Sequence, residues 1–353
     1  MSYLAAADSA SIAEIREAVA ARIGDVPASS VRSYLNINTP DLFERAARGR
    51  YKLRRVNKDI PAQPEIAYAI GRAKLIHASC FDWMRAREPH SIHGVVTDPP
   101  YGLVEYTDIE QAKLRAGRGG VWRIPPSFDG HRRAPLPRFT TLTEGDREAM
   151  HDFFLEFGKL ALRVTAPGAN ILVASNPLLV HVVANAMSAA GLEPRGHLVR
   201  LVMTMRGGDR PKNAHDEFPD VSVMPRSMFE PWLVLRHPLD GRARDTLRKW
   251  NTGGFRRPSP ERPFGDVIKS SPTPRAEKQI APHPSLKPQA FLRAVVRATL
   301  PRGKGVILDP FAGSGSTLAA ANAIGYDSIG IEKDARYVAL AREAIPGLAG
   351  VEA

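Results

Sequence analysis

The chain has 353 residues, enough for two or three domains, and its hydrophobic content of 43% is ample for a globular core. The formal net charge of +12 favours a polyanionic partner, with nucleic acid first, and no apolar run reaches the length of a transmembrane span. A single cysteine excludes an internal disulfide framework, no Cys/His cluster has metal-binding spacing, and residues 1–10 lack a signal peptide's basic leader, so we expect a cytoplasmic protein without metal or membrane.

A small separate module is predicted over residues 1–60. The sequence Ser11-Ile-Ala-Glu14 matches a capping box, in which the serine and glutamate side chains accept backbone N–H groups at a helix start. Apolar residues then keep one helical face until Gly24, where the helix is expected to end. A second short helix is expected over 30–35.

A third helix and a basic strand complete this predicted module. Thr39-Pro40 provides a cap and first turn for a helix that contains Phe43, and residues 48–55 are strand-like and strongly basic. Three helices and a basic hairpin resemble a winged helix, and residues 41–51 are similar to winged helices of the HARE type. The resemblance implies DNA contact through a helix and the wing, and the alternative is a dimerisation or packing module. The wing residues proposed to contact DNA are Arg50, Lys52 and Arg54.

Alternating helices and strands are predicted between residues 67 and 204. The expected elements are a strand and helix start over 75–84, a helix over 151–164, a strand from 171, a helix over 178–190 and a strand over 197–204. This alternation indicates a doubly wound α/β sheet. Aromatic side chains of the helix over 151–164 are expected in the core, and Cys80 is expected to be a buried filler. The long segment 106–138 is either a DNA-contacting flap or a loop without a role.

A strand ending in a rigid acidic turn is predicted within this alternation. Val95-Val-Thr is a short apolar run typical of a buried parallel strand, and it leads into Asp98-Pro99-Pro100-Tyr101. An ionised aspartate and a proline carbonyl are both hydrogen-bond acceptors. Because the two prolines stiffen the turn, these acceptors are held in place before any reaction.

A second strand-turn-helix pattern covers residues 306–317. Val306 to Leu308 is an apolar run, Asp309 to Gly315 contains two glycines, and Ser316 or Thr317 can cap the following helix. Such an arrangement makes a nucleotide pocket, in which glycines allow close approach of the ligand. The plain alternative is a glycine turn in an ordinary α/β protein.

The residues around this turn restrict the nucleotide. No lysine follows Gly315, which excludes a Walker loop, and Leu318 stands where a dinucleotide fingerprint needs a third glycine. Asp309 repels phosphate but suits a cationic amine, and Glu332 falls about 20 residues beyond the glycines, where a carboxylate reaches a ribose hydroxyl. S-adenosylmethionine (SAM) carries both groups.

Together the two motifs resemble the DNA amino-methyltransferases, which methylate adenine N6 or cytosine N4. Their signatures are Asp-Pro-Pro-Tyr and Asp-Pro-Phe-x-Gly-Ser-Gly, found here at Asp98 and Asp309. A third match, His283-Pro-Ser-Leu-Lys287-Pro288, is similar to the family's His-Pro-x-x-Lys-Pro segment. The order of the motifs resembles the family's β arrangement, and the resemblance covers about Leu75 to the C-terminus.

The resemblance implies a Rossmann-like SAM-dependent methyltransferase fold, with a mostly parallel sheet, split over 67–204 and 282–353 by a target-recognition insert over 205–281. It implies that Asp98 and the Pro99 carbonyl act on the target amine, that Pro100 helps to stiffen the turn, and that Tyr101 stacks on a base flipped from double-stranded DNA. Many family members have Gly-Asp at Ala78-Ser79, and this departure leaves the cofactor role of Ser79 open. The implied cofactor residues are Ser79, Lys287, Asp309, Pro310, Phe311, Ala312, Gly313, Ser314, Gly315, Ser316 and Glu332. The implied DNA-contacting residues of the insert are Arg206, Arg256 and Arg257.

We expect a site-specific adenine N6 methyltransferase, because cytosine N4 enzymes more often have serine at the position of Asp98. Cytosine N4 methylation is the first alternative. RNA guanine N2 methylation is disfavoured by the order of the motifs, and a non-catalytic DNA-binding regulator is disfavoured by the intact Asp98, Tyr101, Asp309 and Glu332. The sequence does not decide the recognition site, a homodimer or a restriction partner.

Overall fold

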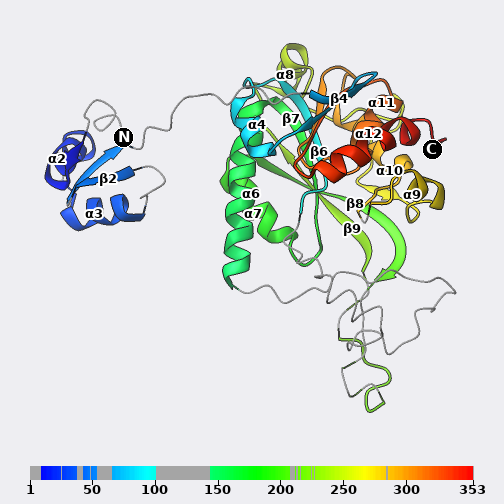
Figure 1. Ribbon diagram of the computed structural model, residues 1–353, viewed down its shortest axis with the longest axis horizontal. Helices are drawn as coiled ribbons and strands as arrows, with labels where there is room; N and C mark the ends of the chain where they lie inside the picture. Colours follow the sequence, from blue (N-terminus) through cyan, green and yellow to red (C-terminus); the bar gives the residue numbers. More distant parts are fainter. Residues whose placement is uncertain are drawn as a thin grey trace. The chain divides into compact units, whose positions relative to one another are not determined.

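The structure is a computed structural model, and it describes residues 9–24, 26–37, 43–47, 49–53, 66–100, 144–206, 211, 214, 216–223, 225, 227–283 and 285–352. The chain divides into two compact units, residues 1–60 and residues 61–353. Each unit has its own core and is described by itself (Figure 1).

The described part of the first unit contains two helices and a small antiparallel sheet. In chain order its elements are β1 (Ala10–Ser11), α2 (Ile12–Ile23), α3 (Ala28–Ile37), β2 (Phe43–Ala47) and β3 (Arg50–Leu53). The strand order is β1-β3-β2, so β3 is central and forms a hairpin with β2. The predicted capping box is confirmed, because Ser11 Oγ accepts from Glu14 N at 3.3 Å while Glu14 Oε2 accepts from Ser11 N at 2.6 Å.

The predicted third helix of this unit is wrong. Phe43 begins strand β2 and pairs with Leu53, and its side chain is only 2% exposed beside the equally buried Tyr51. The cap-like Thr39-Pro40 signal is local, whereas burial of Phe43 and Tyr51 in one core requires the hairpin pairing. The winged-helix assignment stays a prediction.

The second unit is organised around a nine-stranded, mostly parallel sheet (Figure 1). In spatial order its strands are β10 (Val267–Lys269), β8 (Glu193–Arg206), β9 (Ser227–Arg236), β7 (Thr165–Ala174), β6 (Ile92–Thr97), β11 (Val306–Asp309), β12 (Asp327–Glu332), β5 (Ala73–His77) and β4 (Ile66–Ile70). Strand β9 runs antiparallel to both neighbours, and the edge strand β4 runs antiparallel to β5. The other neighbouring strands pair in parallel.

Helices cover both faces of this sheet, as predicted for a doubly wound fold. One face carries α4 (Cys80–Ala86), α6 (Glu144–Val164) and α7 (Val180–Ala189), and the other carries α10 (Gln289–Thr299), α11 (Ser316–Ala323) and α12 (Ala335–Ala349) (Figure 1). Two shorter helices, α8 (Ala243–Trp250) and α9 (Arg275–Ile280), complete the described helices of this unit.

Alternating side chains explain why the strands are apolar throughout. Val95 and Leu308 pack into the core under α6, whereas their neighbours Val96 and Ile307 pack into the core under α10. The aromatic residues of α6 lie in the core as expected, since Phe154 and Phe157 are fully buried and Phe153 packs against the same cluster. Cys80 is buried as well, and burial raises the pKa of its thiol to about 12, which suits an inert filler.

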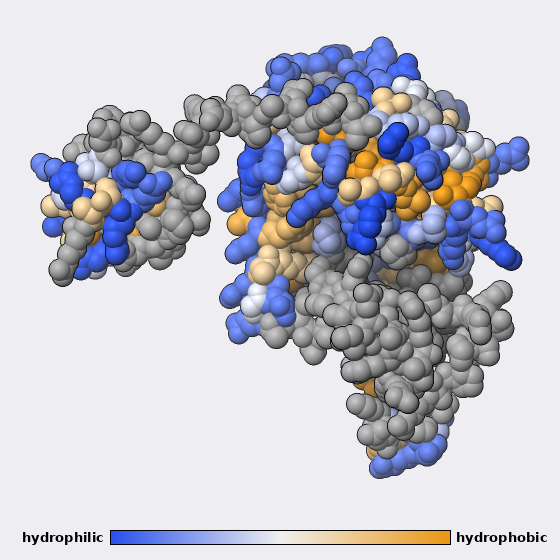
Figure 2. Space-filling view, in the orientation of Figure 1, coloured by the Kyte–Doolittle hydropathy of each residue, from blue (hydrophilic) through white to orange (hydrophobic). Residues whose placement is uncertain are grey.

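The order of the strands creates a crevice between β6 and β11. These two strands are adjacent and parallel, but the chain continues from β11 to β12 on one side and from β6 to β7 on the other. At such a switch point the loops diverge at the carboxyl ends of the strands and leave room for a ligand. Among the described helices, none combines the length and apolar character that crossing a membrane requires. On the face shown in Figure 2, much of the described surface of this unit is hydrophilic, with apolar patches beside α12.

Candidate active site

A pocket with about 370 Å³ of empty space lies at the carboxyl ends of β6 and β11. The pocket unites all three sequence motifs, since Asp98, Lys287 and Asp309 all line it. The remaining lining residues are Trp232, His283, Ser285, Leu292, Phe311, Ala312, Gly313, Ser314, Ser316 and Thr317.

Asp309 is a buried carboxylate that joins the two central strands. It ends β11, and Thr97 at the end of β6 donates to Asp309 Oδ1 at 2.7 Å. Phe311 N also donates to this carboxyl at 3.2 Å, and the Thr317 hydroxyl adds a further hydrogen bond. Burial outweighs these bonds and raises the pKa of Asp309 to about 6. A cationic ligand group would stabilise the ionised form of Asp309, which agrees with the prediction that Asp309 binds a cationic amine.

Glu332 ends the next strand and lies beside the glycine turn. Its Oε2 atom accepts from Gly313 N at 2.8 Å, and its Oε1 atom accepts from Asp334 N at 2.7 Å. The carboxylate is therefore held in place by backbone N–H groups. Each carboxylate oxygen can accept more than one hydrogen bond, so the group can also receive a ligand hydroxyl.

The two glycines of the turn serve different purposes. Both have left-handed backbones, with φ of +51° at Gly313 and +79° at Gly315. A Cβ at Gly315 would lie 2.5 Å from Ile345 Cγ1, so this glycine is required by the packing of α12 and not by a ligand. A Cβ at Gly313 would lie 3.2 Å from Nε2 of His283, on the side of the pocket.

The prediction that Ser316 or Thr317 caps the helix after this turn is wrong. Gly315 occupies the N-cap position of α11 and no side chain caps the helix. Ser316 is instead the first helical residue, and the Thr317 hydroxyl is engaged with Asp309. The Thr317 hydroxyl, which the local sequence pattern predicts as a helix cap, thus forms a hydrogen bond with the buried Asp309 carboxylate instead.

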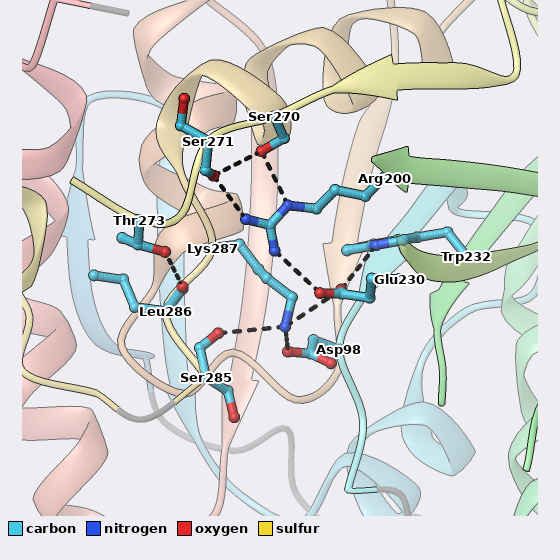
Figure 3. Close-up of polar contacts among 10 residues, drawn as sticks. All are labelled: Asp98, Arg200, Glu230, Trp232, Ser270, Ser271, Thr273, Ser285, Leu286 and Lys287. Carbon is cyan, nitrogen blue, oxygen red and sulfur yellow. Dashed lines mark hydrogen bonds and ion pairs between the residues drawn. The ribbon is translucent and has the colours of Figure 1, made fainter. Parts of the chain in front are cut away.

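Asp98 and Lys287 form an ion pair inside the pocket. Lys287 Nζ donates a hydrogen bond to Asp98 Oδ2, and the lysine residue is 9% exposed. Its ammonium also lies 3.5 Å from Glu230 Oε1 and 3.5 Å from the Ser285 carbonyl oxygen. Lys287 is predicted from the sequence to bind the cofactor, but its ammonium group contacts the proposed catalytic residue Asp98 (Figure 3).

Two further charged residues complete this network. Arg200 Nη1 donates to Glu230 Oε2 at 3.0 Å, and Trp232 Nε1 donates to Glu230 Oε1 at 3.0 Å (Figure 3). Neither Arg200 nor Glu230 is predicted from the sequence as a site residue. A signal was present, because each is a single charged residue within an apolar strand, Leu198-Val-Arg-Leu-Val202 in β8 and Met228-Phe-Glu-Pro-Trp232 in β9.

The other predicted residues of the two motifs are partly described. Pro99 is buried and Pro100 is exposed, and Tyr101 lies outside the described residues. Phe311 lines the pocket, with its ring 5.5 Å from that of Phe157 in the core. Ser79 is the N-cap residue of α4 without a side-chain capping bond. It is not among the residues that line the pocket.

Two arginines of the predicted insert lie away from the pocket. Arg256 Nη1 donates to Tyr326 Oη at 2.6 Å, and Arg257 Nη1 donates to the Pro260 carbonyl at 2.8 Å. Tyr326 precedes β12, so this region lies at the amino ends of the parallel strands, opposite the pocket. The direction of the strands thus separates Arg256 and Arg257 from Asp98, and their base-reading role stays a prediction.

The other residues predicted to contact DNA are Arg50, Lys52, Arg54 and Arg206. Arg50 and Lys52 lie on β3, where Lys52 pairs with Glu44 at 2.8 Å and Arg50 lies 3.8 Å from Glu14. Arg54 and the side chain of Arg206 lie outside the described residues. Part of the predicted insert over 205–281 belongs to the central sheet, since it contains β9 and β10. Within the described ranges, no three His, Cys, Asp or Glu side chains gather as a metal site.

Comparison with known proteins finds a family and relatives that resemble this chain. Residues 92–343 match the model of a DNA methylase family, the N6/N4 methyltransferases. The type II methyltransferase M2.DpnII of Streptococcus pneumoniae is 23% identical over 274 residues, which cover 76% of this chain and 88% of that protein. M2.LlaDCHI of Lactococcus lactis subsp. cremoris is 23% identical over 281 residues, which cover 78% and 90%.

A solved structure shares the fold. The PvuII DNA methyltransferase, described as cytosine-N4-specific, superposes with a TM-score of 0.52 and 13% sequence identity. The match covers 79% of this chain and 88% of that one. At this identity the likeness concerns the fold, and the mostly parallel sheet expected from the sequence is thereby confirmed.

Proposed function

The chain belongs to the N6/N4 DNA methylase family, and from this premise we propose that it transfers a methyl group from SAM to N6 of adenine in double-stranded DNA at a specific site. The observation that carries the proposal is that two acidic side chains line the same pocket. Asp98 follows β6 and Asp309 ends the adjacent β11, so an acceptor for a target amine lies beside a carboxylate for a cofactor ammonium. The named relatives are type II methyltransferases, which supports DNA as the substrate.

The residues that line the pocket, together with the adjoining Glu332, fit SAM by their chemistry. Asp309 is a buried carboxyl whose raised pKa means that its charge lacks full compensation, and the amino group of SAM would supply that compensation. Glu332 offers carboxylate oxygens to ribose hydroxyls beside the left-handed Gly313. Phe311 contributes an aromatic wall. When bound, the cofactor provides an activated methyl group, whose bond to sulfur breaks with its electron pair left on sulfur as the amine lone pair forms the new N–C bond.

Asp98 would act on the amine that receives the methyl group. The lone pair of an exocyclic amine is delocalised into its ring, so transfer requires the nitrogen to become tetrahedral and partly positive. Asp98 accepts a hydrogen bond from the amine and stabilises this developing charge, and the Pro99 carbonyl is the second proposed acceptor. After transfer, the methylated nitrogen loses one proton, first to the Asp98 carboxylate and then to solvent. Tyr101 is proposed to stack on the flipped base.

Adenine is the proposed base because the motif begins with aspartate at position 98. Cytosine N4 methylation is the competing assignment within the same family. The first unit is proposed to contact DNA through β3, as a winged helix would. There the acidic partners of Arg50 and Lys52 reduce the charge available to phosphate.

The test is methylation of duplex DNA by the purified protein with SAM labelled in the methyl group. Digestion to nucleosides followed by mass spectrometry distinguishes N6-methyladenine from N4-methylcytosine. We expect N6-methyladenine, and its loss in Asp98→Ala. Label found only in N4-methylcytosine would reverse the base assignment. Label found in RNA but in no duplex would reject DNA as the substrate.

A further inference from the structure

A chain of four alternating charges leads from the sheet interior to the proposed catalytic carboxylate. Arg200 contacts Glu230, Glu230 lies beside Lys287, and Lys287 donates to Asp98 (Figure 3). The side chains of Arg200, Lys287 and Glu230 are 6%, 11% and 20% exposed. Partly buried charges cost solvation free energy, so an alternating array of this kind needs good geometry to persist.

The inner end of this array is held by several bonds. Arg200 Nε donates to Ser270 Oγ at 3.0 Å, and Arg200 Nη2 donates to the Ser271 carbonyl at 3.2 Å. The guanidinium also lies 5.3 Å from the ring centre of Phe291. Glu230 is in turn fixed at both oxygens, by Arg200 and by the indole of Trp232. The position of Glu230 is thus determined before any substrate arrives.

We propose that Glu230 is a positioning residue, which holds the Lys287 ammonium at Asp98 Oδ2 and thereby fixes the orientation of the Asp98 carboxylate toward the target amine. The inference rests on the proposed role of Asp98. Lys287 Nζ donates to Asp98 Oδ2. A lysine with Asp98 as its only anionic partner could turn across both carboxylate oxygens and would not fix that orientation. Glu230 restrains it from the other side, at 3.5 Å.

The electrostatics of the array agree with this geometry. Burial opposes the charge of Lys287, but the carboxylates of Asp98 and Glu230 outweigh burial and raise the pKa of the lysine. Burial likewise opposes the charge of Glu230, but Lys287 and Arg200 outweigh it and lower the pKa of the carboxyl. The charged groups facing Lys287 are Asp98 after β6, Glu230 from β9 and Arg200 from β8. Loss of Glu230 should therefore lower the pH at which Lys287 loses its proton.

The test compares the wild type with Glu230→Gln, which keeps the shape of the side chain and removes its charge. We expect kcat for methyl transfer to fall about 10-fold to 100-fold, by analogy with the loss of outer-shell partners that orient metal-binding side chains. SAM affinity should be unchanged, because Glu230 does not line the pocket. The alkaline limb of the kcat–pH profile should move to lower pH. A wild-type kcat with an unmoved limb overturns the inference.

A second variant separates positioning from simple stability. Glu230→Gln leaves Arg200 as an uncompensated buried charge, which should lower the melting temperature. Adding Arg200→Met removes that charge and should restore the melting temperature, while kcat and the shifted alkaline limb stay as in Glu230→Gln. Recovery of kcat and of the pH profile together with the melting temperature would show that Glu230 serves stability alone, and would overturn the inference.

The route through Lys287 is tested by a double-mutant cycle. If Glu230 acts by holding Lys287, the Glu230→Gln change should have no further effect on kcat in a Lys287→Met background. Additive effects would contradict that route. Asp98→Ala is measured in parallel: full activity there overturns the proposed role of Asp98 and this inference with it, whereas activity lost in Asp98→Ala but unchanged in Glu230→Gln overturns the inference alone.

Discussion

Replacing Asp309 with asparagine should stabilise the ligand-free protein and weaken its binding of SAM. The carboxyl is 4% exposed, and burial raises its pKa from the ordinary value of 3.8 to about 6. At about 1.36 kcal/mol for each pH unit, this rise corresponds to a cost of about 3 kcal/mol for holding the charge in the folded state. Asparagine is neutral and can keep the bonds from Thr97 and Phe311, so much of that cost should disappear.

The pH dependence gives the sign of this effect. A carboxyl whose folded pKa lies above its unfolded value destabilises the fold when ionised, so the cost is fully present above pH about 6 and is lost as the pH falls toward 3.8. Thermal melting at pH 7 should show Asp309→Asn as the more stable protein, by about 2–4 °C for each kcal/mol. At pH 4 the two proteins should melt together.

Cofactor binding should change in the opposite direction. Loss of a hydrogen bond between charged groups costs about 1.5–3 kcal/mol, so SAM affinity at pH 7 should fall about 10-fold to 150-fold in Asp309→Asn. In the wild type, affinity should also decline as the pH drops below about 6, because a protonated Asp309 must ionise to bind an ammonium. Calorimetry at pH 7 and pH 5 measures both. A variant that melts lower at pH 7 and binds SAM like the wild type would refute the reasoning.

Three further outcomes are expected. Asp98→Ala should lower kcat on the order of 100-fold or more, because the carboxylate acts on the target amine, and calorimetry should show an unchanged SAM affinity. Near wild-type turnover would remove Asp98 from the mechanism. Gly313→Ala should cost about 1–2 kcal/mol of stability from its left-handed backbone and weaken SAM binding beside His283, and unchanged affinity in calorimetry would contradict the pocket assignment. The double variant Arg50→Ala and Lys52→Ala should weaken binding to all duplexes alike. The slope of log affinity against log salt should fall by about 0.9 for each phosphate that the variant no longer neutralises. Loss of site preference on a random-sequence library would instead place recognition in the first unit.

Local patterns were sufficient to predict the strand-turn-helix motifs and the acidic residues at their turns. Short apolar runs mark buried parallel strands, and a polar or glycine-rich turn must follow where such a strand leaves the sheet. The sequence therefore located Asp98, Asp309 and Glu332 and predicted a doubly wound sheet. The prediction was wrong at Phe43, where a local helix signal was overridden by pairing within the hairpin, and at Ser316 and Thr317, where the predicted side-chain cap is absent.

The partners of the acidic residues were decided by the tertiary structure. Thr97 and Asp309 are 212 residues apart and meet because β6 and β11 are neighbours in the sheet. Asp98 and Lys287 are 189 residues apart and meet because α10, which follows Lys287, packs against β6. Arg200 and Glu230 come to Lys287 from strands on the other side of β7. Strand direction likewise placed Arg256 at the amino ends, away from the pocket. The sequence carries the charges, but only the order and direction of the strands determine which charges face one another, because ion pairs depend on distance in space and not on spacing along the chain.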